Sequence, residues 1–192
     1  MQKVYIDTNV LVSYVSGPQK EPREYPKAKQ IFDEIKQGKY IGVISTLTLI
    51  ELQGVLRTLK GYERTILEAM QPNKQADYVK TEATSMYNTL MAELLKLPYI
   101  KFEKGRQTNF QSILDYAYQI MNDIKGIVKL YNNCSICNSN YKRSVHKQIL
   151  VVDILHALLA KETSCDSLIT FDKGFSALIG NSHIGSMRII VQ

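Results

Sequence analysis

The sequence of 192 residues has few cysteines and no long hydrophobic run. Three cysteines, an odd number, do not suit a disulfide framework and argue against a disulfide-stapled secreted domain. No apolar stretch reaches the roughly 18 residues that a membrane span needs. The N-terminal segment MQKVYIDTNVLVSYV carries an acid within its apolar stretch and has no small-residue cleavage site, so we expect no signal peptide. These features predict a soluble, cytoplasmic protein that does not bind membranes.

The sequence also has no internal repeat and no low-complexity segment. Its composition, with 45% hydrophobic and 22% charged residues, is that of an ordinary globular protein. This length is sufficient for one domain with a sizeable core and an insertion. Lys and Arg (24) outnumber Asp and Glu (18), which gives a net charge of +6 and a pI near 9.1. The balance weakly favours a polyanionic partner, such as a nucleic acid.

Four acidic residues stand in strongly apolar surroundings. They are Asp7 in VYIDTN, Glu51 in TLTLIEL, Asp153 in VVDILHA and Asp172 in LITFDKGF. A carboxylate that is buried alone is costly because it loses its hydration. A hard divalent cation would offset this cost, since carboxylate oxygens are the ligands that such cations prefer. The pattern therefore indicates a metal-dependent enzyme.

Short apolar strands alternate with segments of helical periodicity along most of the chain. Strands are predicted at residues 3–6, 40–44, 99–102, 167–170 and 187–191. Helices are predicted at residues 9–15, from Pro26 to a stop at Gly38, and at 48–60, 75–95, 111–131, 145–161 and 173–178, with a loop from Gly17 to Pro26. This alternation predicts the α/β class, with a three-layer α/β/α sandwich around a mainly parallel central sheet.

The predicted topology brings two of the acids together. Ligands of open parallel sheets bind outside the carboxyl ends of the strands, and Asp7 and Asp172 both follow such ends. Glu51 has a competing explanation, because Thr48-x-x-Glu51 has the form of a capping box for the helix that contains it. On the residues alone, both interpretations of Glu51 remain open.

The four acids, in this order and context, resemble those of a PIN domain, the small endoribonuclease fold that includes VapC-type toxins. The resemblance covers about residues 1–60 and 145–192 of what we expect to be a single PIN-like domain spanning residues 1–192. The stretch between Glu51 and Asp153 is longer than in compact toxins of this family. This suggests a helical insertion within about 61–144, although residues 99–102 could still be a strand of the core sheet.

The resemblance implies hydrolysis of RNA phosphodiester bonds with Mg²⁺ or Mn²⁺, by a toxin of a toxin–antitoxin pair or by an RNA-processing nuclease. It assigns catalysis and metal binding to Asp7, Glu51, Asp153 and Asp172, with Asp7 as the principal ligand. RNA, an antitoxin protein and a second copy of the chain are the partners that it suggests. Acids clustered in this way repel one another, so at least one pKa should rise in the absence of metal.

Two other functions remain to be weighed against a nuclease. One is a catalytically inactive RNA-binding or scaffolding module that keeps the fold, which would have no need for four mutually repelling acids. The other is a phosphotransfer or phosphatase protein that uses Asp7 as a nucleophile. The second is disfavoured because Asn9 occupies the position where such a protein would carry a second Asp.

Several polar residues near the acids are candidates for substrate binding. Asn9 and Thr170 could orient water or a phosphate, but Asn9 could equally cap the first helix and Thr170 could be an ordinary strand residue. Lys142 and Arg143 flank a loop with a nearby aromatic residue, which suits RNA but is also typical of a solvated loop. His156 follows Asp153 by three residues, and we interpret it as a packed helix histidine outside the site.

The remaining motif is a single C-x-x-C formed by Cys134 and Cys137. Its spacing to His146 and Cys165 fits no common zinc finger, so we do not expect zinc there. Two free thiols or a bridge formed under oxidising conditions are the alternatives.

Overall fold

Within the described part of the chain, the central sheet has five strands that are all parallel. The structure is a computed structural model that describes residues 1–61, 63–104 and 151–192. The strand order is β3-β2-β1-β4-β5, and every pairing between neighbours is parallel. The strands are β1 (Gln2–Ile6), β2 (Tyr40–Ser45), β3 (Ile100–Glu103), β4 (Ser167–Thr170) and β5 (Arg188–Val191).

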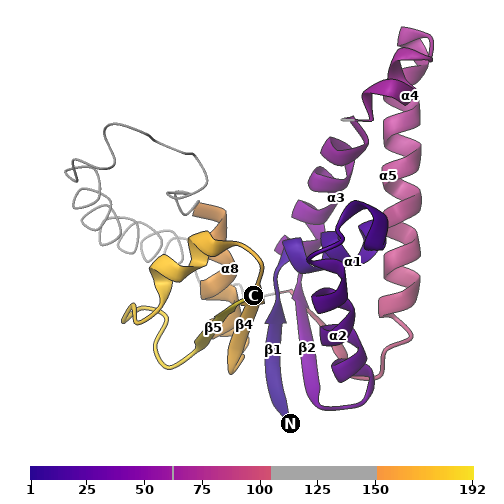
Figure 1. The fold of residues 1–192 in the computed structure, drawn as a ribbon. Helices are drawn as coiled ribbons and strands as arrows, with labels where there is room; N and C mark the ends of the chain where they lie inside the picture. Colours follow the sequence, from indigo (N-terminus) through magenta and orange to yellow (C-terminus); the bar gives the residue numbers. More distant parts are fainter. Residues whose placement is uncertain (62, 105–150) are drawn as a thin grey trace, which may run out of the picture.

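Helices cover both faces of this sheet (Figure 1). One layer contains α1 (Thr8–Lys20), α2 (Tyr25–Lys36), α3 (Thr46–Gly61) and α5 (Pro72–Leu94), with the short α4 (Arg64–Glu68) between the last two. The opposite layer contains α8 (Val151–Glu162) and the 3-10 helix η1 (Lys173–Leu178). Figure 1 shows α3 rising away from the sheet towards α4, and α5 returning beside it.

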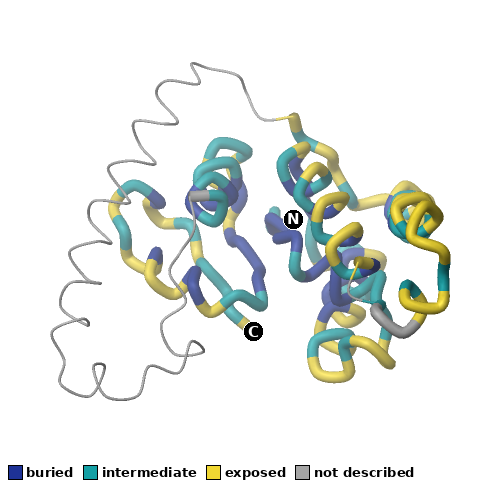
Figure 2. Tube along the Cα trace, turned by 90° about the horizontal axis from the view of Figure 1, so that it is seen from above, coloured by how far each residue is buried: buried dark blue, intermediate teal, exposed yellow. Residues whose placement is uncertain are grey.

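The alternation of side chains along each strand divides the core into two parts. Val4 and Ile6 of β1 pack with the first layer of helices, whereas Tyr5 between them packs with α8 and η1. Ile44 and Val43 of β2 divide in the same way. Figure 2 shows the buried residues gathered along the strands and on the inner sides of the helices, with the exposed residues outside them. The fold is therefore the predicted three-layer α/β/α sandwich.

A glycine in β2 allows a close approach between layers. A Cβ atom at Gly42 would lie 2.8 Å from Cδ1 of Ile35 in α2 and 2.7 Å from Cδ1 of Ile100 in β3. Both distances are shorter than van der Waals contact, so a larger side chain would force the tips of Ile35 and Ile100 to move.

The strand predictions are confirmed, and residues 99–102 do contribute a strand, β3, to the edge of the core sheet. The loop predicted from Gly17 to Pro26 is partly wrong, because α1 continues to Lys20 across a kink. Gly17 takes a φ of 78°, and Pro18 then begins a further turn whose end is marked by a hydrogen bond from Glu21 N to Gly17 O (3.0 Å). Proline is compatible with the first turn of a helix, where its missing N–H is not needed.

Some predictions fall outside the described residues. They are the helix at 111–131, residues 145–150 of the helix predicted at 145–161, the pair Cys134 and Cys137 with His146, and the basic residues Lys142 and Arg143. Among the described residues, no helix is both long enough and apolar enough to cross a membrane.

Candidate active site

Asp7 lies at the carboxyl end of β1 and begins α1. Its Oδ1 accepts a hydrogen bond from the backbone N–H of Thr8 (2.8 Å), which makes it the N-cap of this helix. The parallel register pairs Ile6 with Ile169, so Asp7 stands next to Thr170 of β4. The Thr170 hydroxyl donates to Oδ2 of Asp7 (2.6 Å). Two protein donors thus fix the carboxylate over the ends of two neighbouring strands.

Glu51 reaches the same point from α3. This helix begins at Thr46, two residues before the predicted start, and Ser45 Oγ accepts from the N–H of Thr48 (3.1 Å). The capping-box interpretation of Glu51 is therefore wrong. Its Oε2 instead accepts hydrogen bonds from the Thr8 hydroxyl and from Nε2 of His156 (2.8 Å).

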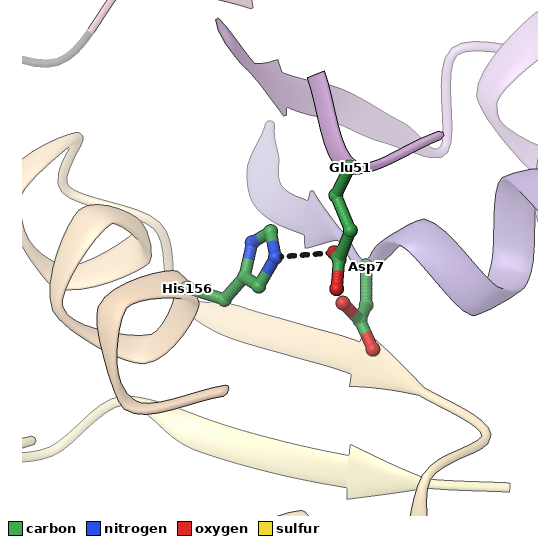
Figure 3. Close-up of side chains that lie close together, drawn as sticks. All are labelled: Asp7, Glu51 and His156. Atoms are coloured by element: carbon green, nitrogen blue, oxygen red, sulfur yellow. Dashed lines mark hydrogen bonds and ion pairs between the residues drawn. The ribbon is translucent and has the colours of Figure 1, made fainter. Parts of the chain in front are cut away.

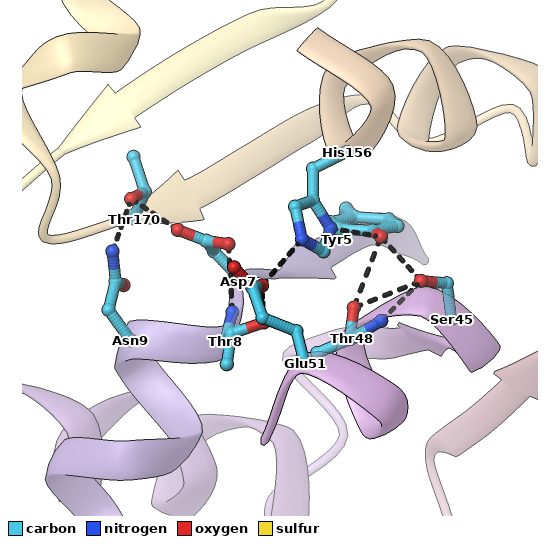
Figure 4. Close-up of polar contacts among 9 residues, drawn as sticks. All are labelled: Tyr5, Asp7, Thr8, Asn9, Ser45, Thr48, Glu51, His156 and Thr170. Carbon is cyan, nitrogen blue, oxygen red and sulfur yellow. Dashed lines mark hydrogen bonds and ion pairs between the residues drawn. The ribbon is translucent and has the colours of Figure 1, made fainter. Parts of the chain in front are cut away.

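His156 comes from α8, in the layer on the other side of the sheet. Only 1% of its surface is exposed, and its Nδ1 lies 2.8 Å from the hydroxyl of Tyr5 in β1. The Tyr5 hydroxyl also contacts Ser45 Oγ (2.6 Å) and Thr48 Oγ1 (3.1 Å). A continuous chain of polar contacts therefore links the start of α3, β1, α8 and Glu51 (Figure 4).

Three potential metal ligands converge where these elements meet. Asp7, Glu51 and His156 each offer one ligand atom, and these three atoms lie within 4.8 Å of one another. Figure 3 shows the three side chains pointing towards the same region from β1, α3 and α8. Asp7 is 4% exposed, whereas the Glu51 side chain is 33% exposed, so the group is open to solvent on the side of Glu51.

Burial and hydrogen bonding shift the pKa values of Asp7 and Glu51 in opposite directions. Burial raises the pKa of Asp7, although His156, Thr170 and the Thr8 N–H oppose the rise and Glu51 adds a little to it. For Glu51, burial alone would raise the pKa, but hydrogen bonds from His156 and Thr8 outweigh it and lower the pKa. The rise expected for one acid falls on Asp7, but its main cause is desolvation and not the repulsion between acids from which it was predicted.

Asn9 and Thr170 are both occupied by contacts within the protein. Asn9 donates through Nδ2 to Thr170 Oγ1 (2.9 Å) and accepts through Oδ1 from the N–H of Phe171 (3.0 Å). The cap of the first helix is Asp7, so the alternative role proposed for Asn9 is wrong. Thr170 is fully buried, and its hydroxyl orients Asp7. A direct role for either residue in substrate binding stays a prediction.

The other two acids do not belong to the group of three ligands. Asp153 lies in the first turn of α8 and is partly buried. Asp172 is the N-cap of η1, where its Oδ1 accepts from the N–H of Gly174 (2.8 Å). The N–H of Asp172 donates to Thr170 Oγ1 (2.9 Å), so the backbone of Asp172 is tied to the same hydroxyl that orients Asp7.

Comparisons with known proteins add a family assignment. A sequence model described as "PIN domain" matches residues 3–174, which is most of the chain. The chain belongs to the PIN-domain family. Among solved structures, the chain is similar to VapBC2 from Rickettsia felis, bound to a DNA fragment from its promoter. The identity is 12% and the TM-score 0.46, over 98% of this chain and 97% of the other. A search of curated proteins finds no match.

PIN domains are generally nucleases and typically use a divalent metal ion, and the residues of this PIN domain fit one. Asp7 and Glu51 offer hard carboxylate oxygens close together, and each carboxylate is held by protein donors. Asp7 is costly to ionise where it lies, which a nearby positive charge would offset. The donor set of this site therefore suits a cation that takes oxygen ligands.

The sequence interpretation of His156 as a packed helix histidine outside the site is right about the packing, since the residue is buried, but its Nε2 contacts Glu51 and it joins the group of potential metal ligands. Two signals could have indicated this position. His156 stands three residues after Asp153, so the two share one side of α8. It is also an imidazole in the apolar run VVDILHALLA, where a buried polar ring requires a partner. That partner, Glu51, is 105 residues away and could not be read from the sequence.

Proposed function

We propose that this protein is a metal-dependent endoribonuclease that hydrolyses RNA phosphodiester bonds at the group formed by Asp7, Glu51 and His156. The observation that carries the proposal is the convergence of two carboxylates beyond the strand ends, where ligands of parallel sheets bind. The desolvation of Asp7, which its hydrogen bonds do not fully offset, is a cost that a bound cation would reduce.

Asp7 and Glu51 would hold Mg²⁺ or Mn²⁺. When bound, such an ion supplies Lewis-acid activation of water and neutralises charge on the phosphate. Thr170 and the Thr8 N–H orient Asp7, and the Thr8 hydroxyl and His156 orient Glu51. The 33% exposed Glu51 side chain lies on the side from which a substrate would enter.

Asp153 and Asp172 lie at the edge of the proposed site, where they would bind the metal ion directly or through a water molecule. Asp172 follows the strand that carries Thr170, and Asp153 lies one helical turn before His156. The proposed biological role is that of a toxin held by an antitoxin protein, or of an RNA-processing enzyme, acting in the cytoplasm. RNA contacts at Asn9, Thr170, Lys142 and Arg143, and a homodimer, also stay predictions.

The test is RNA cleavage by purified protein with Mg²⁺ or Mn²⁺, for the wild type, Asp7→Asn and the matched control Asp33→Asn. Asp33 is 49% exposed and pairs with Lys29 on α2, away from the site, so its neutralisation should leave cleavage unchanged. Asp7→Asn should lower the cleavage rate at least 100-fold, on the order of the loss seen when one electrostatic group of an active site is removed.

Circular dichroism and gel filtration would establish that Asp7→Asn is folded. If folded Asp7→Asn cleaves RNA as fast as the wild type, the site is elsewhere. If the wild type binds RNA but cleaves none with either metal, the protein is an inactive RNA-binding module and not a nuclease.

A further inference from the structure

The hydrogen bonds to Glu51 are distributed unequally between its two carboxylate oxygens. The Thr8 hydroxyl and His156 Nε2 both donate to Oε2. Within the part of the chain that the structure describes, no hydrogen bond reaches Oε1. The carboxylate is therefore anchored through one oxygen, and the other is available to a ligand.

The same contacts determine which nitrogen of His156 carries a proton. An ionised carboxylate can only accept, so the contact with Oε2 requires an N–H at Nε2. In the neutral imidazole Nδ1 then accepts from the Tyr5 hydroxyl, and in the imidazolium it donates to it, so Tyr5 holds the ring in either form. Tyr5 can point its hydrogen at Nδ1 because Ser45 Oγ and Thr48 Oγ1 lie beside its oxygen and can donate to it.

We propose that His156 is a positioning residue for the cation site. Tyr5 fixes the imidazole ring, and Nε2 of His156 holds Oε2 of Glu51. Oε1 of Glu51 is then the oxygen available to the cation. This inference rests on the proposed function, because it requires that Glu51 binds the ion. It assigns His156 a role through Glu51 and no direct bond to the metal, since its Nε2 proton is engaged by the carboxylate. Tyr5, which is fully buried on β1, acts on the site indirectly, through its contact with Nδ1 of His156.

Two substitutions of His156 separate this role from simple packing. In His156→Gln the amide nitrogen is as many bonds from Cα as Nε2, so a donor towards Glu51 is kept. In His156→Asn the amide is as many bonds from Cα as Nδ1, so the contact with Tyr5 is kept and the donor towards Glu51 is lost. Both variants remove the ring from the core and should lower thermal stability to a similar extent.

The experiment is an isothermal calorimetric titration of the metal-free full chain with Mn²⁺ alone, carried out on the wild type and both variants. His156→Asn should weaken Mn²⁺ binding about 10- to 100-fold, the usual loss when a hydrogen-bond partner of a metal ligand is removed. His156→Gln should bind within a few-fold of the wild type. Tyr5→Phe, which keeps the ring and removes the hydroxyl, should weaken binding by less than His156→Asn, and it serves as the main variant if His156→Asn does not fold.

Three results would overturn the proposal. If the wild type binds Mn²⁺ and His156→Asn, or failing that Tyr5→Phe, binds it equally well, His156 is only a packing residue, and the proposed nuclease site is unaffected. If His156→Gln and His156→Asn lose affinity equally while folded, the imidazole itself is needed. If the wild type binds no Mn²⁺, the proposed function fails together with this inference.

Discussion

Asp7 carries most of the electrostatic cost of the site. It caps α1, accepts from Thr170 and is 4% exposed, and its folded-state pKa is nevertheless above the ordinary value of 3.8. Two hydrogen bonds and the nearby His156 therefore do not fully compensate for lost hydration. The ionised carboxylate therefore carries a desolvation cost, which the proposed cation would offset.

This cost predicts a specific dependence of stability on pH. An acid whose pKa is higher in the folded state binds more protons there than in the unfolded state, so stability falls as pH rises through the interval between the two values. Relative to Asp7→Asn, the metal-free wild type should therefore lose stability from about pH 4 upwards. Each tenfold difference in acidity corresponds to about 1.4 kcal/mol.

Urea unfolding in the presence of a chelator, at several pH values from 4 to 8, would measure this difference. Comparing the two proteins at each pH cancels the contributions of other groups and any constant effect of the amide. A difference in unfolding free energy that stays constant over this range would show that the pKa of Asp7 is not raised.

At the scale of single elements, the start of α3 decides where Glu51 points. Ser45 ends β2 and caps α3, and its Oγ also contacts the Tyr5 hydroxyl. One hydroxyl thus joins the helix that carries Glu51 to the strand that carries Tyr5. The sequence predicted this helix but placed its cap at Thr48, because a Ser at the end of a strand and a Thr three residues later are both good caps.

Substitution of this cap gives a prediction with an internal control. Ser45→Ala removes the acceptor for the Thr48 N–H and should lower the unfolding free energy by about 1 kcal/mol, the usual cost of a lost N-cap. Ser167 in β4 is also buried, but its Oγ has no hydrogen-bond partner among the described residues. Ser167→Ala should therefore be neutral or stabilising.

Denaturant unfolding of both alanine variants would test this contrast, since each removes one buried oxygen. Equal losses of stability in the two variants would mean that burial of the hydroxyl alone, and not the cap, accounts for the effect of Ser45→Ala.

At the scale of the whole molecule, the site is assembled from layers on opposite sides of the sheet. Local periodicity predicted the strands, and the carboxyl-end rule placed Asp7 correctly, because both depend on residues near in sequence. The contact between Glu51 and His156 depends on how α3 and α8 pack on opposite faces of the sheet. No local pattern encodes that meeting, so the sequence indicates that His156 packs in α8 but not that it contacts Glu51.

The same architecture predicts that a cation stabilises the whole domain. Asp7 follows β1, Glu51 is carried by α3 and both are tied to α8 or β4, so an ion held by these acids binds the folded chain far better than the unfolded one. Stability should then rise with free Mn²⁺ by mass action, by about 2.7 kcal/mol at a concentration 100-fold above the dissociation constant. The gain should be larger above the raised pKa of Asp7, where binding requires no proton to leave this residue.

Urea unfolding at pH 7 with a series of Mn²⁺ concentrations would measure this gain, with Glu51→Gln as the matched variant. Glu51→Gln keeps the length of the side chain and an oxygen that can accept from Thr8 or His156, but it loses the charge. Its unfolding free energy should respond to Mn²⁺ only at much higher concentrations. If wild type and variant respond equally, the ion binds elsewhere, and the convergence of Asp7 and Glu51 has another cause.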